Sequence, residues 1–312
     1  MEPGQAMGHG RAVVTMVLAT LMWSIAGVVT RQLDAPGLAA EQTFWRSAGA
    51  AASLAVLLPW LMGREALRRS LTQGGWALWA SALCWAMMFT AFMVALALTT
   101  VANVLVAEAL GPLFAALIGR ATLGQRLPLR TWGAIALAGA GIGWMYGPQL
   151  AGAEPRHLLG SALAMVPPLA AASMWTLLQA NERKHPGARV DMRPAVMLGA
   201  TLSALACLPW AWPLRAGAHD VALLGGLGLV QLAIPCALAV AAGRVLSAPE
   251  SALLGLLEIL FGVAWAWASG AEEPPPSVLA GGTLVLLALA GHEAVAMWQR
   301  RQSAVRVASA GS

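Results

Sequence analysis

Long apolar runs alternate with short stretches that carry charge, proline or glycine along almost the whole chain. These runs predict ten helices, at residues 12–32, 41–62, 74–98, 101–119, 129–147, 158–180, 194–212, 221–245, 251–270 and 277–298. About 20 apolar residues in a helix are enough to cross a bilayer. A backbone in lipid must satisfy its own hydrogen bonds, which favours helices over strands. The pattern therefore predicts an all-α polytopic membrane protein with ten transmembrane helices.

The apolar pattern also repeats within the chain. Residues 99–125 align with residues 246–272 without a gap at an offset of 147. Because five helices per copy is an odd number, the second copy must enter the membrane in the opposite sense. Inverted repeats of this kind place the substrate site of secondary transporters at the repeat interface, near the bilayer midplane. We therefore expect a first repeat at residues 1–150 (helices 1–5) and a second at residues 151–312 (helices 6–10) with a short cytoplasmic tail.

Composition agrees with a chain made mostly of membrane spans. Hydrophobic residues make up 59% of the 312 and charged residues 11%, whereas soluble domains have about 25% charged residues. Ten spans with short connections leave no room for an appended soluble enzyme domain, so we expect no enzyme activity. The first apolar segment is longer than the apolar core of a secretory signal and is expected to remain as a span.

The basic residues are distributed unequally between the two sides of the predicted topology. The net charge of +5 would suggest nucleic-acid binding in a soluble protein, but here the positive charges lie in loops. Fifteen of the 19 Lys and Arg residues fall on one side, three fall on the other, and Arg46 lies within the second span. An excess of Lys and Arg marks cytoplasmic loops. We expect a multi-pass protein of the cell inner membrane with both termini cytoplasmic, the lipid bilayer and a small-molecule substrate as partners, and no nucleic acid. A monomer and a homodimer both remain open.

Three phrases of the sequence resemble a known family. They are LMWSIAGVVTRQL, ALALTTVANVLVAEALGPLFAALIGRATLGQRLPLRTWGAIALAGAGIGWM and LLGLLEILFGVAWAWASGAEEPPPSVLAGGTLVLLALAG. They are similar to the EamA family of the drug/metabolite transporter (DMT) superfamily, over residues 11–298. The resemblance implies ten transmembrane helices in two inverted halves, a central cavity lined mainly by helices 1, 3, 4, 6, 8 and 9, and export of small metabolites such as amino acids. The sequence departs from the family at Gln125, where a glutamate is common, and at Ile259, where a proline is common. The second departure predicts a straighter ninth helix.

Two glutamates lie within predicted spans. Glu108 is about seven residues into helix 4 and Glu258 about seven residues into helix 9, so both are roughly 10 Å deep, one from each face. A charged side chain at the centre of a span costs about 2.5–3.5 kcal/mol, so it persists where it has a partner or faces water. One interpretation is a pair of cavity carboxylates that bind a substrate amino group or carry a coupling proton. The alternative is that each is neutral or paired with Arg46 and holds helices together.

Other candidate binding residues are aromatic or polar side chains within the spans. Trp23, Trp85 and Trp175 are either an aromatic wall for a cation or planar substrate or ordinary packing. Asn103 is either a helix N-cap or a cavity donor. Arg46 is expected to extend towards the nearby membrane interface, and a role in the site is the alternative.

Several further motifs concern helix geometry. Pro112, Pro167–Pro168 and Pro235 each remove a backbone donor within a span and predict kinks. Gly139, Gly143 and Gly147 are spaced four apart and predict close helix approach. His292–Glu293 begins an HExxH pattern that lacks its second histidine, so it predicts an interfacial pair and no zinc site.

The sequence therefore predicts a secondary transporter that exports small metabolites, amino acids or amines, by alternating access. An uptake permease of the same fold and, from another class, an integral-membrane enzyme are the alternatives. No catalytic residue, metal or cofactor is predicted, apart from a coupling proton.

Overall fold

The computed structural model describes residues 7–25, 29, 33, 39–99, 101–124, 127–146, 155–184, 191–268, 276–277, 279–292 and 295. Within them the elements are helices, and no strand is present. They are α1 (His9–Trp23), α3 (Ala39–Met62), α4 (Arg64–Gln73), α5 (Gly75–Leu98), α6 (Val101–Glu108), α7 (Gly111–Leu123), α8 (Leu129–Tyr146), α9 (Pro155–Ala164), α10 (Val166–Lys184), α11 (Pro194–Ala211), α12 (Ala218–Leu227), the π-helix η2 (Gly228–Ala233), α13 (Ile234–Gly243), α14 (Ala248–Gly255), α15 (Leu257–Ala268) and a last helix at Leu279–His292.

Each apolar run of the sequence corresponds to one or more of these helices. Among the described residues, five helical segments are long and apolar enough to cross a membrane, and a sixth is added if the bent pair α3 and α4 counts as one span. The five are Gly75–Leu98, Leu158–Lys184, Pro194–Ala211, Ala218–Gly243 and Ala248–Trp265. The described part of the chain therefore has helices as its regular elements, and its apolar helices indicate a multi-pass membrane protein, as the hydrophobic pattern predicted.

Helix α4 was not predicted, because its charged sequence gives no apolar run. It follows α3 after Gly63 and is bent from it by 113°. Gly63 has φ 82°, a left-handed conformation that glycine adopts without a steric penalty. The segment between the second and third predicted helices is therefore a short polar helix and not a loop.

The predicted proline kinks coincide with interruptions in the helices. Pro112 follows the break between α6 and α7, Pro167 follows the break at Met165 between α9 and α10, and Pro235 is the second residue of α13, which follows η2 directly. The helix assignment is therefore interrupted at all three places, and the bends themselves stay a prediction.

The ninth predicted helix is interrupted once, and whether it is straighter than in the family stays a prediction. The helix breaks at Leu256, between α14 and α15, although no proline is present. Leu256 donates to the carbonyl of Leu253, and Ile259 donates to the carbonyl of Leu256, both at 3.1 Å. These i to i−3 bonds tighten the turn as in a 3₁₀-helix, which interrupts an α-helix without removing a donor.

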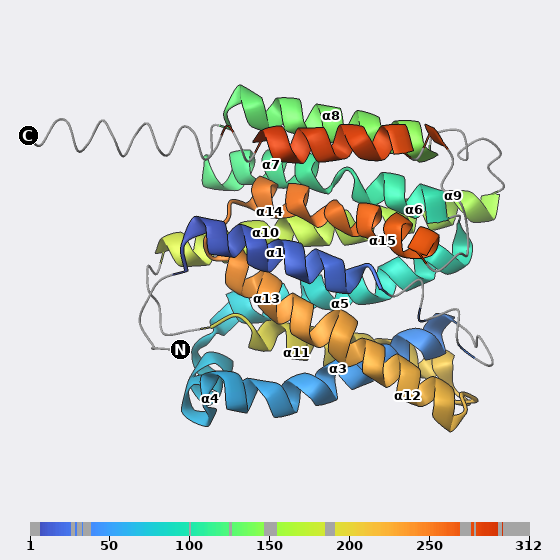
Figure 1. Cartoon of the computed structure of the whole chain (residues 1–312). Coiled ribbons are helices and arrows are strands. Elements are labelled where there is room, and N and C mark those ends of the chain that lie inside the picture. Colours follow the sequence, from blue (N-terminus) through green and yellow to red (C-terminus); the bar gives the residue numbers. More distant parts are fainter. Residues whose placement is uncertain are drawn as a thin grey trace, which may run out of the picture.

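The helices form a bundle in which segments from the two ends of the chain are interleaved (Figure 1). Helix α8 and the helix Leu279–His292 lie together along one edge, while α3, α4 and α12 lie along the opposite edge. Between them, α1 packs against α13, α5 packs against α10, and α7 packs against α14. The centre of the bundle is thus built from both halves of the sequence.

The glycines that allow the closest approach in α8 are not the predicted ones. A side chain at Gly139 or Gly143 would meet open space, and Gly147 lies outside the described residues. A Cβ at Gly141 would instead lie 2.6 Å from the carbonyl oxygen of Gly281. The spacing of four residues identified the correct helix but the wrong face.

Exposed tryptophans lie at both ends of the bundle. Trp60 and Trp76 flank α4 and are 82% and 72% exposed. Trp210 and Trp212, 72% and 71% exposed, lie at the end of α11, which is next to the start of α3 because Glu41 accepts hydrogen bonds from the backbone of Arg215 and Ala216 at 2.7 and 2.8 Å. Tryptophan is enriched at both interfaces of a bilayer, so this distribution fits a protein that spans one.

Candidate substrate cavity

A cavity of about 160 Å³ lies between the two halves of the chain. Its lining comes from α1, α5, α6, α7, α10, η2, α13, α14 and α15, together with one residue of α3, Arg46. These elements correspond to predicted helices 1, 3, 4, 6, 8 and 9, which are the helices expected to line the cavity. Arg46 adds predicted helix 2. We call this space the central cavity.

The two predicted glutamates both line the central cavity. Glu108 ends α6 at the first break, and Glu258 is the second residue of α15, just past the other break. Neither forms a hydrogen bond or an ion pair with another residue in the described part of the chain. A direct pair of Arg46 with either glutamate is therefore absent from the described residues, while the alternative that each glutamate is neutral is not tested by this geometry. Both carboxylates keep free acceptor capacity that faces the cavity.

All three predicted tryptophans also line the central cavity. The rings of Trp85 and Trp175 pack edge to face, with centroids 6.5 Å apart and an interplanar angle of 80°. Trp85 additionally lies 5.6 Å from the ring of Phe89. Trp23, at the end of α1, is only partly buried. Packing and cavity lining are thus combined in the same residues, and a direct role in binding remains a prediction.

Two glycines leave room for the edge-to-face tryptophan pair. A Cβ at Gly199 of α11 would lie 2.5 Å from Cβ of Trp85. A Cβ at Gly243 of α13 would lie 2.9 Å from the six-membered ring of Trp175. The two indoles therefore occupy positions that only glycine on the facing helices permits.

The structure places Arg46 in the central cavity and not at the membrane interface. Its side chain is buried, with 5% of the residue exposed. Nη1 donates to Oε1 of Gln231 and Nη2 donates to the carbonyl oxygen of Phe89, each at 3.4 Å. The expectation that Arg46 reaches the interface was wrong, because these two acceptors hold the guanidinium inside the bundle.

Gln231 is a cavity residue that the sequence reasoning missed. It is 5% exposed, and its Nε2 donates to the carbonyl oxygen of Trp23 at 3.1 Å. A lone amide within the apolar run 221–245 was the available signal, since a polar side chain inside a span usually faces a partner or a cavity.

Asn103 is the third residue of α6, inside the helix and not at its N-cap. Its side chain lies outside the described part of the structure. Whether it lines the cavity therefore stays a prediction.

The central cavity lies off-centre along the bundle. Its lining stops at Trp85 in α5 and at Trp175 in α10, although α5 begins at Gly75 and α10 continues to Lys184. Beyond Trp85 and Trp175, towards these helix ends, the bundle is filled by fully buried side chains such as Leu78. The end of the bundle that carries the C-terminal ends of α10 and α13 is therefore closed.

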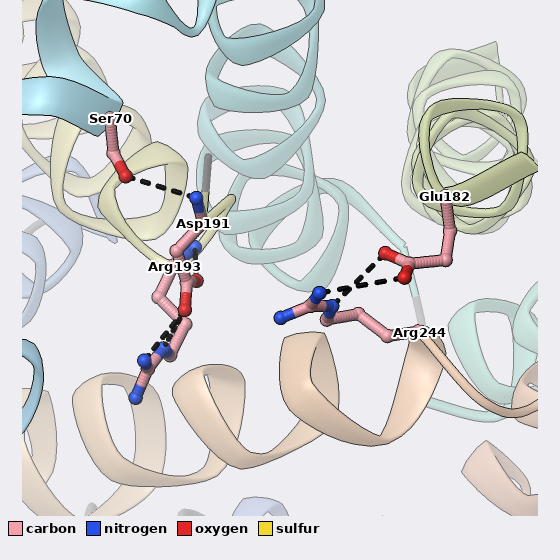
Figure 2. A network of polar contacts seen from close by, with 5 residues as sticks. All are labelled: Ser70, Glu182, Asp191, Arg193 and Arg244. Carbon is pink, nitrogen blue, oxygen red and sulfur yellow. Dashed lines mark hydrogen bonds and ion pairs between the residues drawn. The ribbon is translucent and has the colours of Figure 1, made fainter. Parts of the chain in front are cut away.

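Ion pairs and hydrogen bonds join the helices at this closed end (Figure 2). Arg244, after α13, donates from Nε to Glu182 of α10 at 3.1 Å. Ser70 of α4 accepts a hydrogen bond from the backbone of Asp191 at 3.0 Å, and Asp191 pairs with Arg193 at 2.6 Å.

His292 behaves as a packing residue. Its Nε2 lies 3.2 Å from Oγ1 of Thr131 in α8, and Glu293 lies outside the described residues. Among the described residues, no three His, Cys, Asp or Glu side chains are grouped so that they could hold a metal ion.

Comparison with known proteins adds to this geometry. Residues 10–147 match the EamA-like transporter family. Pseudopaline exporter CntI from two strains of Pseudomonas aeruginosa is 25% identical to the chain over 276 residues, which are 88% of this chain and 93% of the exporter. A solved crystal structure superposes with a TM-score of 0.70 at 19% identity, covering 91% of this chain and 97% of the other.

The likeness to the solved structure concerns the fold alone, and it extends over both halves of the bundle. The family match lies in the first half, which contributes Trp23, Arg46, Trp85 and Glu108 to the central cavity. This chain is a multi-pass membrane protein whose residues 10–147 are similar to the EamA-like transporter family.

Proposed function

We propose that the protein is a secondary transporter that exports small amphipathic metabolites, amino acids or amines, across the cell inner membrane. The observation that carries the proposal is the central cavity, which brings Glu108 and Glu258 together with three tryptophans from both halves of the chain. Carboxylates attract an ammonium group, and indole faces attract cations and pack against apolar groups. Efflux is favoured over uptake by the exporter among the relatives.

Two features support an inverted repeat of ten helices behind this function. With the offset of 147, the helix break after Glu108 in the first repeat aligns with the helix break after Gly255 in the second. The packing is also related by the repeat, since α1 against α13 corresponds to α10 against α5, while the contact of α3 with α11 corresponds to itself. A two-fold related pair of bundles around one site is the arrangement from which alternating access arises by rocking of the halves.

An unpaired carboxylate at the cavity is also suited to carry a coupling proton. When a substrate ammonium group enters the cavity, it competes with the proton for the same carboxylate oxygen atoms. This competition couples export of the substrate to entry of a proton. This coupling depends on Glu108 or Glu258, the acidic residues that line the cavity.

The test is growth of a strain that overexpresses the protein on a panel of toxic amino acids and amines. We expect wild-type protein to raise resistance to at least one compound, and Glu108→Gln to abolish the gain because the amide cannot pair with an ammonium or release a proton. Glu65→Gln, at an exposed position in α4, is the matched control and keeps the resistance. Increased sensitivity with wild-type protein would indicate uptake, and no difference for any compound would contradict both directions.

Proton coupling is measured separately in proteoliposomes with an imposed pH gradient. Wild-type transport is expected to accelerate with the gradient and Glu108→Gln transport to be indifferent to it. Acceleration of equal size in both proteins would remove Glu108 from the coupling step.

A further inference from the structure

Arg46 and Gln231 form a polar pair on the wall of the central cavity that the proposed function does not use. They come from α3 and η2, which belong to different halves of the chain. Both are buried, and both line the central cavity. Their role must therefore be explained by the cavity or by packing.

The backbone is built to bring these two residues together. A Cβ at Gly228 of η2 would lie 2.3 Å from the carbonyl oxygen of Arg46, and a Cβ at Gly49 would lie 2.6 Å from Cα of Gly225. The two helices therefore touch backbone to backbone beside the pair. Gln231 is also within a π-helical turn, a distortion that often occurs at functional sites because it re-aims a side chain.

The hydrogen bonds fix the pair but leave its donors incompletely used. Because Nε2 of Gln231 donates to Trp23, Oε1 is the atom that faces Arg46. The two bonds of the guanidinium are both long, at 3.4 Å. Nε of Arg46 is buried and has no hydrogen-bond partner among the described residues. A guanidinium has five N–H donors, so a buried one with so few partners is under-satisfied.

A buried cation without a directly bound counter-ion is costly. Arg46 and Glu258 both line the cavity, but they do not form an ion pair, nor does any other acidic residue of the described chain pair with Arg46. A ligand anion that entered the cavity would supply both the charge and the missing acceptor. Arginine suits this task because its planar donors match a carboxylate in a two-pronged geometry.

We infer that Arg46, held by Gln231, is the site for a substrate carboxylate, so that the central cavity selects zwitterions over simple amines. The inference rests on the proposed function and narrows its substrate class. The carboxylate binds at Arg46, the ammonium group binds between Glu108 and Glu258, and the side chain packs against the tryptophans. With one cation and two acidic groups, the cavity has opposite poles, and only a ligand that carries both charges satisfies both.

The test compares matched ligands on purified protein, with binding followed by tryptophan fluorescence. The probes are phenylalanine, leucine and lysine, each with the amine that decarboxylation gives. We expect wild-type protein to bind at least one amino acid about 10- to 100-fold more tightly than its amine, the range for a hydrogen bond to a charged group. Arg46→Gln is expected to lose this preference while it keeps the affinity for the amine.

A second variant separates the anion site from folding. Gln231→Glu places a carboxylate at the position that already contacts Arg46, so it should satisfy the guanidinium internally and abolish the preference without removing the arginine. Arg68→Gln, at an exposed position in α4, is the control and keeps the preference. Size-exclusion chromatography and thermal unfolding verify that each variant is folded.

The outcomes distinguish this inference from the proposed function. If wild-type protein binds amines but not amino acids, the carboxylate site is wrong and an amine exporter remains. If Arg46→Gln retains the preference, Arg46 is not the carboxylate site, although the proposed export function stands. If wild-type protein binds no compound of either kind, the proposed function fails and the inference fails with it.

Discussion

At the scale of single residues, small side chains decide how close the helices come. Gly228 has helical φ and ψ of −54° and −41°, so the backbone conformation does not require a glycine at this position. It is required by contact, because an added Cβ would lie 2.3 Å from the carbonyl oxygen of Arg46 and 2.5 Å from the backbone nitrogen of Ala50. Backbone atoms cannot rotate away as a side chain can, so α3 and η2 would have to separate.

We expect Gly228→Ala to destabilise the protein by about 1–3 kcal/mol, the usual cost of overpacking. Gly226→Ala is the matched control, since a Cβ there meets open space and alanine favours the helix by about 1 kcal/mol. Thermal unfolding in detergent measures both. Equal melting temperatures for the two variants would contradict the close packing of α3 on η2.

At the scale of elements, each carboxylate of the cavity lies beside a helix break. Glu108 is the last residue of α6, while Glu258 is in the first turn of α15. A negative charge is favoured at a helix N-terminus and disfavoured at a C-terminus. The two glutamates therefore have unequal electrostatic surroundings, and the offset of 147, which aligns Glu108 with Gly255 and Glu258 with Gly111, already implied such asymmetry.

The pair Arg244 and Glu182 joins the ends of α13 and α10 at the closed end of the bundle (Figure 2). Its side chains are 36% and 30% exposed, so its contribution is at most about 1 kcal/mol. That amount is nevertheless about a fivefold change in a conformational equilibrium.

We therefore expect Arg244→Glu to change the transport rate by up to about fivefold and the exchange of both charges, Glu182→Arg with Arg244→Glu, to restore it. Arg68→Glu is the control, because it breaks an exposed pair with Glu65 inside α4 that joins no two helices. Transport in proteoliposomes is the measurement. A double variant no better than the single one would show that the pair does not hold α10 to α13.

At the scale of the whole molecule, the distribution of basic residues predicts the orientation in the membrane. The end with α4 carries Arg64, Arg68 and Arg69, and the loop between α11 and α12 carries Arg215. Because the excess of Lys and Arg marks the cytoplasmic side, α4 should be cytoplasmic and the central cavity should lie nearer the opposite face.

This orientation is tested by cysteine labelling in a variant that lacks Cys84, Cys207 and Cys236. We expect Ala218→Cys, at the start of α12, to react with a membrane-impermeant maleimide on intact cells, and Glu65→Cys to react only after permeabilisation. Both positions are exposed. The reverse labelling pattern would overturn the orientation and place the cavity towards the cytoplasm.

Much of this protein could be predicted from the sequence because lipid limits what a chain can do. Apolar runs in a membrane protein must be helices, prolines interrupt them, and a charged residue inside a span must face a partner or water. These rules predicted the helices and their interruptions near Pro112, Pro167 and Pro235, and they singled out Glu108 and Glu258 as residues to examine.

Only the tertiary structure decided which side chains meet. The inward direction of Arg46, the participation of Gln231, the break at Leu256 without a proline, and the contact at Gly141 in place of Gly139 all depend on distances between helices. Sequence periodicity gives the face of a single helix, but a cavity is formed by several helices together. Contacts such as that of Gly228 with Arg46 join residues 182 positions apart, and no local pattern encodes them.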